Sequence, residues 1–105
     1  MLTREQIRDE LAEIQIYYRW KNDFDSAPKE IRAERIYETL EKYNAVMRRA
    51  PAKLYLLYLG LYIQDRTQSA LADEWGYTKD YIKSSNLGLV EYIENTINSF
   101  PGAQM

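Results

Sequence analysis

The sequence predicts an all-α fold, a domain of four to five helices. Apolar residues recur every three or four positions along two long segments, which is the spacing of one helix face. Only four glycines and three prolines interrupt the 105 residues. The length suits one hydrophobic core, so we expect residues 1–105 to form a single domain.

The first helix is predicted over residues 4–21. Thr3 is its expected N-cap, and Gln6 completes a capping box. Its apolar stripe is Ile7, Leu11, Ile14 and Tyr18. Residues 22–26 read as a loop, in which Ser26 caps the next helix.

The second helix is predicted over residues 28–49, with the stripe Ile36, Leu40, Tyr43 and Met47. Its outer face alternates acidic and basic side chains, which indicates a solvated surface. Pro51 should end it, because proline disfavours the helical conformation at the preceding residue. The third helix, over 51–64, is apolar almost all round and is expected to be the central buried helix.

Two more helices are predicted, over residues 68–75 and 79–98. Gly88 is expected to kink the second of them or split it in two. Together residues 68–89 fit a helix-turn-helix. Ala72 supplies the small residue where the helices touch, Gly76 supplies the positive φ, and Ile82 packs the second helix. Leu71 and Trp75 fill the apolar positions of the first helix, and Thr78 caps the second. Ser85 departs from the usual apolar pattern, and Leu87 and Leu89 are expected to complete the packing.

The predicted organisation is therefore an N-terminal helical hairpin over 1–49, a helix-turn-helix part over 50–98 and a frayed tail over 99–105. If the motif binds DNA, its second helix enters the major groove. The candidate groove residues are Thr78, Lys79, Tyr81, Lys83 and Ser84, accompanied by Asp80 and followed by Asn86. The candidate phosphate contacts are Thr67 and Gln68, at the first helix's N-terminus, and Arg48, Arg49, Lys53 and Arg66. The alternative interpretation is that Lys79 and Lys83 are simply solvated charges.

Composition excludes several kinds of site. Cysteine and histidine are both absent, which removes disulfides, thiolate and imidazole metal ligands, and the commonest general base. The carboxylates are spread along helix faces, so we expect no enzyme activity, no cofactor and no metal. No run of about 18 apolar residues could span a membrane, and no signal peptide is evident. The expected location is the cytoplasm of a bacterial host.

Charge is uneven along the chain. Residues 1–41 carry seven basic and ten acidic side chains, whereas residues 42–105 carry seven basic and six acidic ones. A polyanion would therefore bind the C-terminal part. Most of the ten tyrosines lie at core spacing. Tyr17, Tyr18 and Trp20 end the first helix with more apolar area than one stripe buries, which indicates a surface for self-association or a partner.

The stretch from Ala45 to Asn98 resembles the helix-turn-helix domain of sigma factor region 4. The resemblance lies in the leucine-rich run 54–62 followed by residues 67–78. With a charged helical arm before it, the chain is similar to small phage late-gene regulators of the RinA/ArpU type. This resemblance implies sequence-specific binding of double-stranded DNA and regulation of transcription, with host RNA polymerase or another host protein as a further partner. Of the candidate residues, it carries over Gln68, Thr78, Lys79, Lys83 and Ser84.

The leading hypothesis is thus a phage or prophage DNA-binding transcription regulator, dimeric through its first two helices. A second hypothesis is a protein-binding module, such as a phage inhibitor of a host enzyme or an assembly adaptor, which uses the same fold only as a scaffold. A third is a structural helical subunit that oligomerises.

Overall fold

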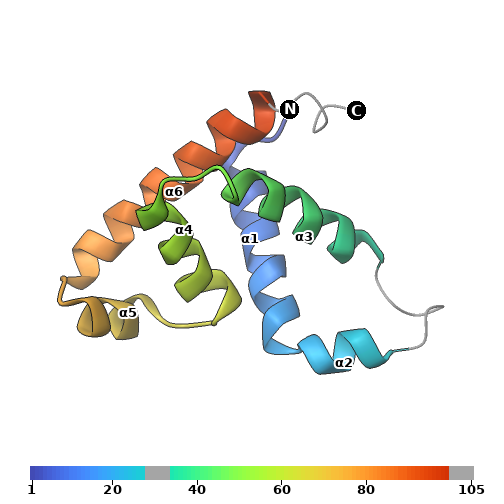
Figure 1. The fold of residues 1–105 in the computed structure, drawn as a ribbon, viewed down its shortest axis with the longest axis horizontal. Helices are drawn as coiled ribbons and strands as arrows, with labels where there is room; N and C mark the ends of the chain where they lie inside the picture. The colour runs from blue at the N-terminus through green and yellow to red at the C-terminus, as the bar shows by residue number, and fades with distance from the viewer. Residues whose placement is uncertain (28–33, 100–105) are drawn as a thin grey trace.

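The computed structural model describes residues 1–27 and 34–99, which form helices and connections without a β-strand. The prediction of an all-α fold is therefore confirmed (Figure 1). The elements are α1 (Arg4–Arg19), α2 (Lys21–Ser26), α3 (Glu34–Met47), α4 (Ala52–Tyr58), the π-helical turn η1 (Leu59–Ile63), α5 (Gln68–Trp75) and α6 (Lys79–Ser99). These described ranges hold six α-helices, more than the expected four to five.

Helix α1 begins at the predicted capping box. The Thr3 Oγ1 accepts a hydrogen bond from the Gln6 backbone N at 3.2 Å, and the Gln6 Oε1 accepts one from the Thr3 backbone N at 2.9 Å. Ile7, Leu11 and Ile14 of the predicted stripe are buried. The last position differs, because Tyr17 is buried while Tyr18 is only half-buried.

Helix α2 occupies the segment that we predicted to be a loop, and this prediction is wrong. Its Asn, Asp and Ser residues favour loops through local hydrogen bonds, but here tertiary contacts prevail. Asp25 Oδ1 accepts hydrogen bonds from the hydroxyls of Tyr17, at 2.9 Å, and Tyr37, at 2.8 Å. Asp25 Oδ2 accepts a third from Lys21 Nζ at 2.8 Å. Ser26, the predicted cap of the next helix, is instead the last residue of α2.

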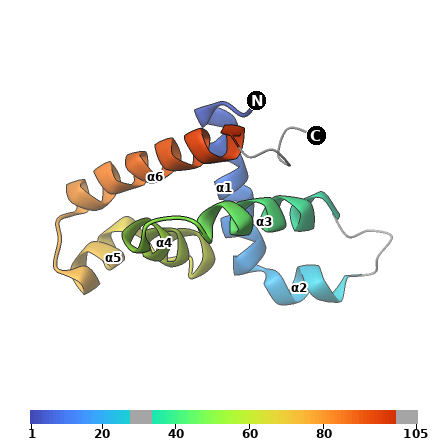
Figure 2. The ribbon, with the colours of Figure 1, turned by 45° about the horizontal axis from the view of Figure 1, so that its top comes forward.

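Helix α3 is described from Glu34 onward, so the predicted residues 28–33 of this helix lie outside the described residues. Its stripe is buried as predicted: Ile36, Leu40, Tyr43 and Met47. Helix α2 lies between α1 and α3 in the chain, and α3 crosses α1 steeply (Figures 1 and 2). The two N-terminal helices are thus joined by a third rather than by a simple hairpin turn.

The predicted helix 51–64 is present, but its second half is a π-helical turn, in which the Gln64 N donates to the Leu59 O at 2.8 Å. Its expected burial on all sides is wrong, because Tyr55 is 41% and Leu56 50% exposed. Only one side of this helical segment is covered, by α1, α5 and α6. The buried side holds Leu57, Tyr58, Gly60 and Leu61.

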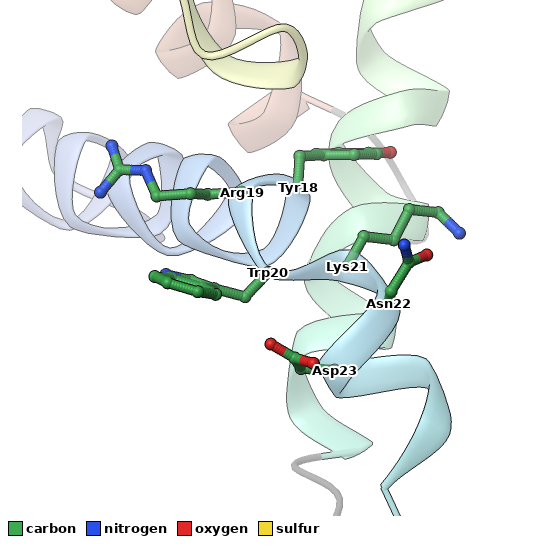
Figure 3. Close-up of a pocket in the computed structure, with 6 residues that line it drawn as sticks. All are labelled: Tyr18, Arg19, Trp20, Lys21, Asn22 and Asp23. Carbon is green, nitrogen blue, oxygen red and sulfur yellow. The ribbon is translucent and has the colours of Figure 1, made fainter.

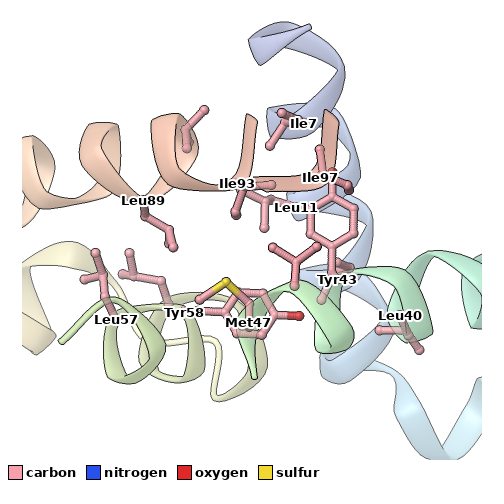
Figure 4. Packing of buried hydrophobic residues seen from close by; sticks show 14 of the residues in the cluster. Ile7, Leu11, Leu40, Tyr43, Met47, Leu57, Tyr58, Leu89, Ile93 and Ile97 are labelled. Atoms are coloured by element: carbon pink, nitrogen blue, oxygen red, sulfur yellow. The ribbon is translucent and has the colours of Figure 1, made fainter. Parts of the chain in front are cut away.

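The core is continuous from the N-terminal to the C-terminal helices (Figure 4). Leu89, Ile93 and Ile97 of α6 pack with residues of α1, α3 and α4. The chain ends of the described part are tied together: the Leu2 backbone N donates to the Asn98 Oδ1, and the Asn98 Nδ2 donates to the Leu2 O, both at 2.9 Å. The first helices therefore pack onto the C-terminal ones and do not extend away from them.

One carboxylate is buried where α1 meets α3. Glu10 is 8% exposed, and its Oε1 accepts a hydrogen bond from the Tyr43 hydroxyl at 2.8 Å. The Lys42 Nζ lies 3.3 Å from the same oxygen. Burial and the adjacent Glu10 carboxylate raise the pKa of the Tyr43 hydroxyl, which therefore stays protonated and donates to Glu10.

We predict that Tyr43→Phe lowers the free energy of unfolding by about 1.5–3 kcal/mol, because it removes a hydrogen bond to a buried charged group. Tyr92→Phe is the matched control. Its hydroxyl donates at 3.1 Å to a neutral acceptor, the Val46 carbonyl. Urea denaturation of both variants tests this prediction, and an equal or smaller loss in Tyr43→Phe would contradict it.

The hydrogen bonds of Asp25 predict that the stability of the fold depends on pH. Hydrogen bonds from Lys21, Tyr37 and Tyr17 lower its pKa from 3.8 to about 2. Because the folded-state pKa lies below the unfolded one, Asp25 stabilises the fold above pH 3.8, and this contribution is lost as the pH falls toward 2. The melting temperature of Asp25→Asn should therefore fall less steeply between these pH values than that of the wild type. Parallel slopes in thermal melts would show that the carboxylate does not stabilise α2.

Candidate nucleic-acid interface

Helices α5 and α6 are joined by a short turn whose ends are both capped. The Thr67 Oγ1 accepts a hydrogen bond from the Ala70 N at 3.0 Å, which starts α5. Gly76 ends it in the left-handed region, with φ of 75°. The Thr78 Oγ1 accepts from the Tyr81 N at 3.1 Å and starts α6. The predicted roles of Gly76 and Thr78 are confirmed.

The inner faces of the two helices are buried. Leu71, Ala72 and Ile82 are all buried, at 3% exposure or less. Leu89 also joins the core, but Leu87 does not, since it is 49% exposed. The expectation that Leu87 completes the packing is therefore wrong. Gly60 allows η1 to lie close to α5, because a Cβ at this position would come within 2.9 Å of Leu71 Cδ1.

The outer face of the first turns of α6 is exposed. It carries Lys79, Lys83 and Ser84, together with the acidic Asp80. No ion pair among the described residues engages either lysine. Helix α6 runs through Gly88 without a break, so the predicted kink or split is wrong. The two lysines therefore lie one turn apart on a single uninterrupted helix, whose first turns are at one end of the molecule (Figure 1).

The other candidate residues differ in their availability. Arg48 and Arg49 are exposed in the connection between α3 and α4, and Gln68 is half-buried. Arg66 forms an ion pair with Glu74. The Lys53 ammonium donates to the Tyr81 hydroxyl, and this hydrogen bond lowers the pKa of Tyr81.

The remaining polar candidates already have intramolecular roles. The hydroxyls of Thr67 and Thr78 cap helices, as described above. The Asn86 Oδ1 accepts from the Tyr62 hydroxyl at 2.6 Å, which holds α6 against η1. Lys79, Lys83, Ser84 and Arg48 are thus the best-placed candidates for contact with a ligand, and Arg49 is exposed beside Arg48.

Acidic side chains limit the positive potential of this end of the molecule. Asp73 and Glu74 are exposed on α5, and Asp80 is exposed beside Lys79. Residues 66–84 contain three basic and three acidic side chains. A polyanion would therefore be attracted by individual lysines rather than by a broad basic surface.

Sequence reasoning missed a second feature next to this interface. Lys53, Leu56, Trp75 and Tyr77 line an open pocket of about 490 Å³. The sequence placed Leu56 only within the leucine-rich run 54–62, because an apolar residue on an apolar helix carries no signal of which side neighbouring helices cover. Tyr77 is 50% exposed, as is Leu56.

The aromatic end of α1 is less available than the sequence indicated. Tyr17 is buried and Tyr18 half-buried, whereas Trp20 is 55% exposed. Figure 3 shows the Trp20 ring pointing away from Tyr18, over a polar pocket that residues 18–23 line. Of the three aromatic residues predicted to form a partner surface, only Trp20 presents most of its ring to solvent.

No family model, curated protein or solved structure matches this chain. Within residues 1–27 and 34–99, no helix is long and apolar enough to cross a membrane. The same residues contain no group of three acidic side chains placed to hold a metal ion. The case for a function therefore depends on the geometry of the helices themselves.

Substitution by alanine should have opposite effects on stability at two glycines, Gly76 in the turn after α5 and Gly88 within α6. Gly76→Ala should destabilise the fold by about 1–2 kcal/mol, because an L-residue is strained in the left-handed region. Gly88→Ala should instead stabilise it by up to about 1 kcal/mol, because alanine favours the helix interior. A Cβ at either position meets nothing within 4 Å, so steric clashes do not confuse the comparison. Chemical denaturation of both variants tests the turn, and effects of the same sign would contradict it.

Proposed function

We propose that this protein is a sequence-specific DNA-binding regulator of transcription that reads duplex DNA with the outer face of α6. The observation that supports this most is the exposure of Lys79, Lys83 and Ser84 in the first turns of α6, directly after the capped turn from α5. Lys79 and Lys83 lie one helical turn apart. In helix-turn-helix proteins, the corresponding second helix enters the major groove with its N-terminal residues toward the bases. Lysine can donate to guanine, and serine can pair with any base.

The same arrangement supports a set of phosphate contacts around α6. Arg48 and Arg49 are exposed at the connection that leads into α4, and α4 packs against α6. Gln68 lies in the first turn of α5, where free backbone N–H groups favour an anion. Arg66 and Lys53 contribute charge nearby, although each already has an intramolecular partner. The proposed interface is thus small and only moderately basic.

The resemblance to sigma factor region 4 extends the proposal to its setting. The protein acts in the cytoplasm of a bacterial host, is encoded by a phage or prophage, and has RNA polymerase as a candidate partner. A homodimer through α1 and α3 belongs to the same proposal, because two copies on one duplex double the number of lysines at the DNA. No catalytic role is proposed for any residue.

The second candidate function is a protein-binding module, and the surface of α1 favours it. Ile16 of this helix is 47% exposed, and Trp20, which directly follows the helix, is 55% exposed. Ile16 also lines a largely apolar groove with Phe24 and Ile36, which Glu13 and Arg35 complete. Such a surface suits a protein partner better than DNA, because its apolar side chains have no counterpart on a phosphate backbone.

Fluorescence anisotropy of a labelled random-sequence duplex tests the DNA-binding proposal. The wild type should bind, with affinity that falls as salt rises, because binding releases counterions from the phosphates. Lys79→Ala/Lys83→Ala should weaken binding and reduce the slope of log affinity against log salt by about 2, one per lost lysine contact.

The matched control is Arg8→Ala/Arg35→Ala, which removes the same charge from exposed positions of α1 and α3, away from the start of α6 (Figure 1). It should bind duplex nearly as the wild type does. Absence of binding at low salt, or an equal loss in both double variants, would remove the support for α6 as the DNA-reading helix and leave the protein-binding module as the better hypothesis.

A further inference from the structure

The open pocket between α4 and the turn that precedes α6 has an unusual lining. Leu56 comes from α4, Trp75 ends α5, and Tyr77 lies in the turn. These side chains are apolar or aromatic, and Lys53 is the one charged residue in the lining. Leu56 and Tyr77 are each half exposed, so a ligand could reach both of them directly.

The aromatic side of this pocket is a stack of two tyrosine rings. The rings of Tyr77 and Tyr81 are stacked, with centroids 4.3 Å apart and an interplanar angle of 29°. The Lys53 ammonium lies 4.4 Å from the centroid of the Tyr81 ring and donates to its hydroxyl. The stack therefore orients the Tyr77 ring and holds a positive charge beside the pocket.

The approach to the pocket is free of negative charge along the chain. Residues 42–64 contain four basic side chains and no aspartate or glutamate. Three of the four basic residues, Arg48, Arg49 and Lys53, are exposed between the end of α3 and the start of α4. The connection itself therefore offers a phosphate backbone cations and no carboxylates, whereas α5 and α6 carry acidic residues.

We propose that this pocket binds an unpaired base of a nucleic-acid strand, which stacks on Tyr77 and Trp75 while Lys53, Arg48 and Arg49 contact the flanking phosphates. Aromatic faces beside a basic path are the combination by which proteins hold single strands, because every base has a face that can stack. This inference rests on the proposed nucleic-acid-binding function. It assigns to the protein a contact with bases outside the duplex, such as those at a melted or frayed segment next to the α6 site.

The fluorescence of Trp75 provides a direct test. The chain has two tryptophans, and Trp20 lies on α1's C-terminal end, away from the pocket, so Trp20→Phe leaves Trp75 as the only reporter. Oligothymidylate of about eight nucleotides should quench this fluorescence saturably, as expected for a base stacked on the ring. Tyr77→Ala in the same background should weaken the binding about tenfold or more, whereas Tyr77→Phe should restore it, because phenylalanine keeps the stacking face.

Two further ligands separate the outcomes. A blunt-ended duplex of two fully complementary strands should be bound through Lys79 and Lys83 but should leave Trp75 fluorescence nearly unchanged. Polyglutamate supplies negative charge without bases and should not quench. Equal quenching by polyglutamate and oligothymidylate would overturn the proposal in favour of an acidic protein partner.

The two proposals fail in different ways. Absence of quenching, or an affinity for oligothymidylate that Tyr77→Ala leaves unchanged, overturns the pocket. If the duplex still binds and depends on Lys79 and Lys83, the proposed function stands. If oligothymidylate binds and the duplex does not, the pocket stands as a single-strand site and the duplex-reading role of α6 fails. The circular dichroism spectrum of each variant should match that of the wild type, because Tyr77 is half exposed and is not needed for folding.

Discussion

The buried side of α6 is the constraint on which the rest of the structure depends. Ile82, Leu89, Val90, Ile93 and Ile97 are all buried along one side of a 21-residue helix. Helices α1, α3, α4 and α5 each pack against α6, whereas α2 packs against α1 and contacts the core through Phe24. Because one side of α6 is fully committed to the core, its opposite side must face solvent. The exposed lysines of its first turns are a direct result of that division.

Elements with local signals could be predicted from the sequence, and elements set by tertiary contacts could not. Helix α5 matches residues 68–75 because Thr67 and Gly76 encode its two ends. Helix α2 was missed because its residues favour a loop, whereas hydrogen bonds from the Tyr17 and Tyr37 hydroxyls, on α1 and α3, make Asp25 an anchor. The uninterrupted run through Gly88 has a similar cause, since packing of the flanking Leu89 outweighs the weak helix propensity of one glycine.

For the candidate site, the sequence identified the exposed residues but not their pairings. Lys79 and Lys83 are exposed as the outer face of α6 requires, while Arg66 and Lys53 are engaged by Glu74 and Tyr81. Nothing in residue spacing predicts such pairs, because their partners lie on other helices or turns. The pocket beside Tyr77 was missed for a related reason: burial of Leu56 depends on how neighbouring helices are placed, which apolar periodicity does not specify.

Helix α2, which Asp25 anchors, and the core helices differ in local stability. None of the six residues of α2 is buried, and the helix is held by hydrogen bonds to one carboxylate and by contact between the rings of Phe24 and Tyr17. A segment with so little burial can open by itself, long before the core unfolds. Its amide hydrogens should therefore exchange with solvent while those of α6 remain protected. Since α2 lies at the opposite end from the start of α6 (Figure 2), such opening would leave Lys79 and Lys83 in place and expose fresh aromatic surface at the other end.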